Sequence, residues 1–483
     1  MAQGSSTRSL ASAPAQPPRL AWPPPPRSRP AQMVHLGAAG LLAACLLAAA
    51  RAAVEEFTVY TEAIRLRPGE VHNRAPPPLP LPAALVQRFA GRSMAVVGYD
   101  VDIVRRDGPA EASIPLSELY NHHYVLVLGT NETVERAYKE YSQHDPLNPN
   151  AHKGCFGGAH NKALLGGKNG SSVAFGGGSG AEFRHTSYDL AAPFRYVLES
   201  PESFVALLHF INTKGLEGKR LLECPCTSAR HINVTNGTID GYRPLPFHCT
   251  HELLEQHNTA CALATYEGGY RCCEHGVFLT EHPDYSAPAD EVVVKFTVRF
   301  EEVTPATRAA SATVCCDVTA DLEQAGNIEY DIPMCDPASG SECVHVATTV
   351  QTVDTLPGLG HMPGHAARAG SPDDLVDLVH AYGHQHVGGL GMELYDDRTG
   401  QLLCTSLPHY GRGEAPGDEA GYVVGFSACN WGPPPLRPPP RMRRADKLRV
   451  VARYNSSRAH HGVMSLWLMQ KSDVPKASAA VLV

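Results

Sequence analysis

Two pairs of closely spaced histidines are the residues of this 483-residue chain whose types and spacing could do chemistry. His384 and His386, in AYGHQHVGGLG, are two residues apart. Alternate side chains of a β-strand share a face, so both imidazoles can bind one metal ion without distorting the backbone. The same spacing also occurs on exposed strands that bind no metal, and that interpretation stays open.

The second pair, His122 and His123 in LYNHHYVLVLG, is adjacent. On a regular strand the two rings would point to opposite faces. They can bind one metal ion only where the backbone bends, at a bulge or a strand end. Asn121 and the start of the apolar run favour such a bend, although the pair could also be an accident of a chain with 24 histidines.

Three further positions lie in or beside later apolar runs. His209, in FVALLHFIN, is by default a core histidine whose ring nitrogens are hydrogen-bonded, and Met464, in HHGVMSLWLM, is by default core packing. His460 and His461 precede Met464 and either line the same site or are loop histidines.

The elements that must position these residues are short β-type runs separated by Gly- and Pro-rich turns, a pattern typical of β-sandwiches. Helical periodicity is restricted to residues 132–142 and 249–257. We therefore predict an all-β protein. The expected strands are 57–66, 93–104, 124–129, 204–211, 291–303, 389–396, 421–429, 448–455 and 462–470.

The runs fall into two groups, which predict two consecutive antiparallel β-sandwich (jelly-roll-like) domains with disulfides and long loops. The first covers residues 54–303 and contains a Cys-rich insertion at 220–285. The second covers 304–472, contains a Pro-rich loop at 433–444 and is followed by a tail at 473–483. The glycine runs between 154 and 181 lack the spacing of a phosphate-binding loop.

Residues 1–53 contain no acidic residue and predict a leader. An apolar stretch from Met33 ends in Ala50-Arg51-Ala52, which fits a secretory signal peptide that starts at Met33. The alternative is an organelle transit peptide, because Arg- and Ser-rich leaders also suit that role. The apolar stretch is too short and too rich in alanine for a stable membrane span.

Sequons and cysteines favour secretion of a glycoprotein. Fourteen cysteines, of which only Cys45 lies in the leader, predict a disulfide framework in an oxidising compartment, with local pairs such as Cys335 and Cys343. Zinc is the weaker alternative, because adjacent Cys-Cys is not a usual zinc spacing. The predicted glycosylation sites are Asn131, Asn169, Asn233, Asn236 and Asn455.

The net charge of −8 comes with no basic block except the short one at 441–444. Nucleic-acid binding needs concentrated Lys and Arg, so no nucleic-acid partner is expected.

The order of the histidines and the methionine resembles the type II copper, ascorbate-dependent monooxygenases, the group of the peptidylglycine α-hydroxylating enzyme and dopamine β-hydroxylase. The resemblance implies two copper ions on two β-sandwich domains, facing each other across a cleft. It makes His122, His123 and His209 the ligands of an electron-transfer copper, on which the first three rings converge. It makes His384, His386 and Met464 the ligands and catalytic residues of the copper that binds dioxygen.

These residue types suit that chemistry. Imidazole binds both copper oxidation states, and a thioether favours Cu(I). The resemblance implies that ascorbate reduces both coppers and that a C–H bond of the substrate is hydroxylated.

Nearly the whole chain, about 55–472, resembles the plant family of stress up-regulated nodulins. The resemblance rests on LYNHHYVLV, INTKGLEGKRLLECPCTSARHINVT, GGYRCCEH, HAYGHQHVGGLGMELYDDRTGQLLC, YGRGEAPGDEAGYVVGFSAC and YNSSRAHHGVMSLWLM. The family name describes expression and does not imply a reaction.

The chain departs from the peptide-amidating enzyme at the position of its substrate-binding arginine, which is Tyr382 here. Leu466 and Leu468 replace the Asn and Tyr that follow its copper-binding methionine. A peptidylglycine substrate is therefore not expected, and the small-molecule substrate and oligomeric state are left open.

Two functions remain: a secreted copper monooxygenase, and a non-catalytic secreted binding glycoprotein for metal or cell-wall contacts. Metal storage is a third.

Overall fold

The computed structural model describes residues 53–106, 110–142, 172–176, 180–216, 278, 284–311, 314–318, 329–336, 342–353 and 371–475. The predictions for the leader, for nearly all of the Cys-rich insertion and for most of the tail lie outside these ranges. Residues 52–483 form one compact unit.

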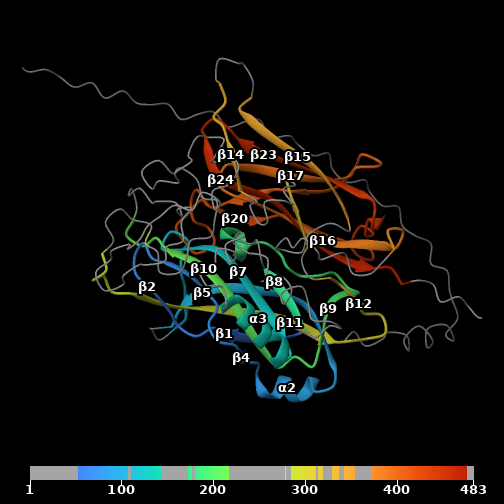
Figure 1. Ribbon diagram of the computed structural model, residues 1–483, viewed down its shortest axis with the longest axis horizontal. Helices are drawn as coiled ribbons and strands as arrows, with labels where there is room; N and C mark the ends of the chain where they lie inside the picture. The colour runs from blue at the N-terminus through green and yellow to red at the C-terminus, as the bar shows by residue number, and fades with distance from the viewer. Residues whose placement is uncertain are drawn as a thin grey trace, which may run out of the picture. The chain divides into compact units, whose positions relative to one another are not determined.

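Two sheets are built from the strands between residues 55 and 309, which are called the first group of strands (Figure 1). The first has the order β1-β11-β5-β9-β12, with β2 paired to β11 and β6 to β5, and the second has the order β3-β10-β7-β8, with β4 paired to β10. Their bounds are β1 Glu55–Tyr60, β2 Ile64–Leu66, β3 Val71–Arg74, β4 Leu79–Pro80, β5 Ser93–Arg105, β6 Ala112–Ser113, β7 Leu119–Gly129, β8 Ser172–Gly176, β9 Phe194–Glu199, β10 Ser203–Asn212, β11 Asp290–Glu302 and β12 Arg308–Ala309.

Three sheets are built from later strands. Their orders are β13-β24-β16-β21, with β14 paired to β24 and β22 to β16, then β15-β23-β17-β18, and the pair β19-β20. Their bounds are β13 Val314–Asp317, β14 Glu329–Ile332, β15 Val344–Thr352, β16 Leu375–Gln385, β17 Gly389–Asp396, β18 Gln401–Ser406, β19 Pro408–Tyr410, β20 Val423–Phe426, β21 Ala428–Asn430, β22 Arg441–Arg443, β23 Lys447–Asn455 and β24 His460–Asp473.

The predicted all-β, sandwich-like architecture is confirmed. Among the described strand pairs all are antiparallel except β12 with β9. Sheet membership changes between β12 and β13, but the division into two separate domains stays a prediction. The Pro-rich loop at 433–444 includes the short strand β22.

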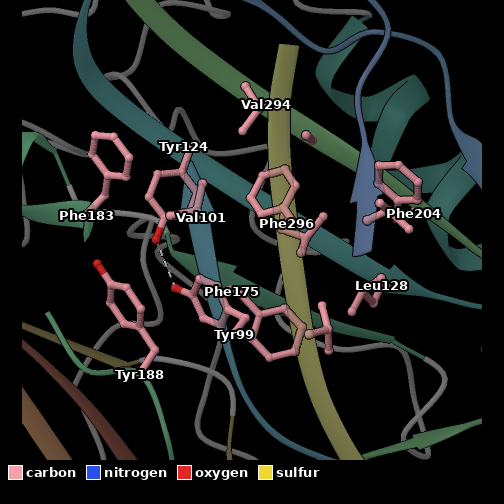
Figure 2. Packing of buried hydrophobic residues seen from close by; sticks show 14 of the residues in the cluster. Tyr99, Val101, Tyr124, Leu128, Phe175, Phe183, Tyr188, Phe204, Val294 and Phe296 are labelled. Carbon is pink, nitrogen blue, oxygen red and sulfur yellow. Dashed lines mark hydrogen bonds between the residues drawn. The ribbon is translucent and has the colours of Figure 1, made fainter. Parts of the chain in front are cut away.

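Alternating side chains form the core between the first two sheets. On β11 every second residue from Val292 to Phe300 is buried, as expected for a strand with one face in the core. Figure 2 shows Val294 and Phe296 of this strand packed with aromatic residues such as Tyr99, Tyr124 and Phe175. Complete burial of each such side chain contributes about 1.5–3 kcal/mol, so the alternation fixes the register of β11.

The same core cluster extends into the second half of the chain. It includes residues of β16, β20 and β24, among them Tyr382 and Met464. A second cluster, built around Trp431 and Trp467, lies within the later sheets. The strands that bear His384 and Met464 therefore pack directly against the first group of strands.

Helical structure is sparse in the described residues. The α-helix α3 (Asn131–Ser142) confirms the periodicity at 132–142, whereas 249–257 lies outside the description. The short α2 (Ala83–Phe89) and the 3-10 helix η1 (Ala181–Arg184) were not predicted. No helix among the described residues is long and apolar enough to cross a membrane.

Two disulfides are present in the described residues. Cys335 pairs with Cys343, as predicted. Cys404 of β18 pairs with Cys429 of β21, a connection that the sequence does not predict. The remaining predicted pairs involve side chains outside the description.

Candidate metal centre

A β-bulge places the adjacent histidines. In the ladder between β7 and β10, His123 lies opposite His209 and Asn121 lies opposite Phe210. His122 is therefore the extra residue of β7, with no residue directly across from it. A bulge re-aims side chains at such a point, and the bend expected from the sequence is confirmed.

The three rings of the first set lie close together. The ring centroid of His122 lies 4.3 Å from those of His123 and His209, and the centroids of His123 and His209 are 6.1 Å apart. The adjacent pair therefore lies beside His209, and convergence of the three rings on one shared point stays a prediction. Their role as metal ligands stays a prediction.

The second set lies on β16 and β24. His384 is buried and lies opposite Leu466, so Met464, two residues before Leu466, is on the same face of the sheet. His386 follows the end of β16, and its ring centroid lies 5.3 Å from that of His384.

A single hydroxyl connects the two ends of this set. Tyr454 Oη accepts a hydrogen bond from the backbone N–H of His386 at 2.9 Å. It donates to the backbone carbonyl of Met464 at 2.6 Å. Since Tyr454 is buried, this bridge fixes the backbones of His386 and Met464 next to each other.

The two sets touch. The ring centroids of His123 and His384 are 6.5 Å apart, and the positive form of His122 would be repelled by both His384 and His386. The expectation that the two histidine sets form separate clusters across a cleft is wrong. The reason is that residues of β16 and β24 pack in the core of the first group of strands.

A carboxylate that the sequence did not single out completes the cluster. Glu182, in η1, is hydrogen-bonded through one oxygen to His384 Nδ1 at 2.6 Å, and both side chains are buried. Its other oxygen accepts the backbone N–H of Gly180 at 3.1 Å. Glu182 is 202 residues away from His384 in the sequence, and no sequence motif surrounds it that could have identified it.

Several ring nitrogens lack hydrogen-bond partners. In this cluster the described residues offer no partner to Nδ1 of His122, to either ring nitrogen of His209, or to Nε2 of His384. Buried polar atoms are nearly always satisfied, so such a group of orphaned nitrogens indicates a missing partner such as a metal ion or water. The default interpretation of His209, a core histidine with hydrogen-bonded nitrogens, is not what the described residues show.

Electrostatics keep the rings neutral. Burial, reinforced by repulsion from neighbouring histidines, lowers the pKa of His122 and of His386 to about 3. Burial and neighbouring histidines also hold the pKa values of His123 and His209 well below the usual range. Neutral imidazole is the form that binds metals, so no proton competes for these nitrogens at neutral pH.

The residue types fit a transition metal, whereas the ring orientations do not yet converge on one. As they stand, no three His, Cys, Asp or Glu side chains of the described chain are arranged to hold a metal ion. Rotating a histidine ring away from its preferred angle costs roughly 1 kcal/mol, while the strand register already fixes the backbone positions. Metal binding contributes several times that free energy, so a ring rotation is affordable, and the binding of an ion here stays a prediction.

The other predicted residues take different places. His460 begins β24, and its Nε2 donates to the Asn455 carbonyl at 2.8 Å, which gives this ring a structural partner. The side chain of His461 lies outside the description. Tyr382 is buried, with its ring 5.4 Å from that of Tyr188.

Two of the five sequons are described. Asn131 begins α3 and Asn455 ends β23, and both are exposed. Asn169, Asn233 and Asn236 lie outside the described residues.

Comparison with protein families gives a match over most of the chain. Residues 52–473 match the sequence model of the family described as Stress up-regulated Nod 19. No curated protein matches the chain.

Proposed function

The chain belongs to the Stress up-regulated Nod 19 family, and from that premise we propose that it is a copper protein of the monooxygenase type. It would hydroxylate a C–H bond of a small organic molecule with dioxygen and ascorbate. The supporting observation is the contact cluster of His122, His209 and His384, with its buried ring nitrogens that lack partners in the described residues.

Copper is the metal that this donor set suits best. Imidazole accommodates both oxidation states, and the thioether of Met464 favours Cu(I). Bound copper would supply the reductive activation of dioxygen. The reaction balances as R–H plus O2 plus ascorbate giving R–OH, water and dehydroascorbate.

The protein's own residues would hold the metal ligands in place and orient the substrate. The bulge at His122 directs two adjacent rings to one side, and Tyr454 keeps His386 beside Met464. Tyr382 stands in place of an arginine and is buried in the core, so no positive charge is available there for a substrate carboxylate. An uncharged substrate therefore suits the site better than a carboxylate.

Secretion and glycosylation belong to the same proposal. Two disulfides in the described residues suit an oxidising compartment, and the exposed Asn131 and Asn455 are accessible to a glycosyl transferase. The chain would then act as a secreted glycoprotein.

One observation favours the second candidate, a non-catalytic metal-binding glycoprotein. The two histidine sets are in contact, with His123 and His384 ring centroids 6.5 Å apart. Two metal centres with separate roles need two separate ligand sets, and this contact leaves the two sets without a separation. A single centre that stores or senses the metal needs no such separation.

Redox cycling distinguishes the two candidates. The protein is loaded with Cu(II), reduced with ascorbate without oxygen, and then exposed to oxygen while the Cu(II) electron paramagnetic resonance signal and oxygen uptake are recorded. The monooxygenase proposal predicts loss and return of the signal with oxygen uptake. Met464→Leu, a change of similar volume, should weaken Cu(I) binding about tenfold while Cu(II) binding is retained.

A signal that ascorbate does not remove, or that oxygen does not restore, would contradict the enzyme and leave the binding glycoprotein. The Met464 variant also tests the ligand set, because equal Cu(I) affinity in both proteins would exclude the thioether as a ligand.

A further inference from the structure

We infer that Glu182 is a positioning residue of the metal centre, which fixes the proton of His384 on Nδ1 and leaves Nε2 free to bind the metal. The inference rests on the proposed copper centre and adds a residue to it. The argument starts from the hydrogen bond between the buried Glu182 carboxylate and His384 Nδ1 at 2.6 Å.

The direction of this hydrogen bond follows from the chemistry of a carboxylate. Glu182 Oε2 accepts the backbone N–H of Gly180 at 3.1 Å, and Oε1 faces His384 Nδ1. A charged carboxylate has no proton to donate, and Nδ1 of His384 must carry the hydrogen. Metal-binding histidines are held in the same way, by a carboxylate on the nitrogen that does not bind the metal.

The other ring nitrogen of His384, Nε2, is then free to accept a metal ion. Nε2 of His384 is buried and has no hydrogen-bond partner within the described part of the chain. With the hydrogen on Nδ1, a neutral ring presents a lone pair at Nε2. That lone pair can bind a metal ion, whereas in the other tautomer Nε2 would be a buried donor without an acceptor.

The segment around Glu182 is fixed against both histidine strands. Asn121 Nδ2 donates to the carbonyl of Gly180 at 2.7 Å, next to the bulge. A Cβ atom at Gly180 would lie 3.1 Å from the carbonyl oxygen of His122 and 3.4 Å from His384 Cε1. Glycine at 180 therefore allows η1 to approach both sets of histidines.

The neighbouring Arg184 does not neutralise Glu182. It pairs instead with Asp102 at 2.8 Å and with Glu419 at 3.5 Å. The carboxylate of Glu182 is thus left to hydrogen-bond His384, which orients the ring as a metal ligand.

The test is a Cu(II) titration of the full-length apoprotein against a competing chelator, with wild type, Glu182→Gln and Glu182→Ala. We expect the affinity for Cu(II) to fall 10–100-fold in Glu182→Ala. Glu182→Gln keeps an acceptor for Nδ1 and should lose less. The electron paramagnetic resonance parameters of bound Cu(II) should shift in both variants. Glu301→Gln is the control, because its carboxylate pairs with Arg195 and contacts no histidine.

The melting temperature of each apoprotein separates positioning from folding, since a purely structural role would lower it without changing the spectrum of bound copper. Wild type that binds copper, together with Glu182 variants of unchanged affinity and spectrum, would overturn the role of Glu182 alone. Wild type that binds no copper would overturn the proposed centre and this inference together.

Discussion

Asp377 is a buried carboxylate held between two arginines at the start of β16. It accepts hydrogen bonds from Arg308 at 2.7 Å and from Arg441 at 2.8 and 3.1 Å. Burial alone would raise its pKa, but the hydrogen bonds from Arg441 and Arg308 outweigh burial and lower it. The ion pairs connect β12, β16 and β22, so this residue contributes to stability away from the histidines.

Asp377→Asn should lower the free energy of unfolding at neutral pH, because the charged partner of both arginines is lost. The expected loss is about 1–2 kcal/mol, since solvent screens the partly exposed arginines. Since the folded pKa lies below the unfolded value, the stabilisation is present above about pH 4 and is lost as the pH falls further. Urea unfolding of both proteins between pH 7 and pH 3 measures this. A difference that stays constant or grows towards pH 3 would refute the assignment.

At the residue scale, the sequence identified the histidines but not their partner. His384 and His386 are recognisable from a two-residue spacing, and His122 with His123 from adjacency. Glu182 was not predictable, because its contact with His384 depends on how η1 packs across two sheets. Only the folded chain brings these residues together.

At the element scale, the bulge in β7 is the feature that turns two adjacent histidines to one place. The sequence predicts a strand at 124–129, whereas β7 begins at Leu119 and includes both histidines. The polar residues Asn121, His122 and His123 interrupt the apolar pattern, so periodicity could not place the start of the strand. Pairing with the apolar β10 overrides that local pattern.

Deleting His122 should leave the sheet intact, because His123 would still face His209 and Asn121 would still face Phe210 in a regular ladder. The free energy of unfolding should change by about 1 kcal/mol or less, while Cu(II) affinity falls. Circular dichroism, urea unfolding and copper titration measure these effects, with His122→Ala as the variant that keeps the bulge. Global unfolding on deletion, or unchanged copper affinity, would show that the bulge has another role.

At the scale of the whole molecule, the β-sandwich class could be predicted from turns and alternation, but the relation between the two groups of strands could not. The apolar run around Met464 predicts core packing for this residue, whereas no local pattern predicts burial of Tyr382. Nor does any local pattern show that both residues belong to the same core cluster as Phe296 of β11. This packing brings the two histidine sets into contact.

A shared core predicts cooperative unfolding. Because residues of β16, β20 and β24 pack in the cluster of the first two sheets, the two groups should melt together. Differential scanning calorimetry should give one transition whose calorimetric enthalpy equals the van't Hoff enthalpy. Two resolved transitions would mean that the groups are independent domains.

Copper retention tests the central claim most directly. The purified protein is loaded with copper, dialysed and analysed for metal, together with His209→Ala, His384→Ala and His380→Ala. His380 is the matched control, because it is a buried histidine of β16 whose Nδ1 contacts Gln470 at 2.9 Å. The proposed centre predicts that the His380 variant retains as much copper as wild type, and that both other variants retain less. Wild type without bound copper, or His209 and His384 variants that retain as much as wild type, would contradict the account.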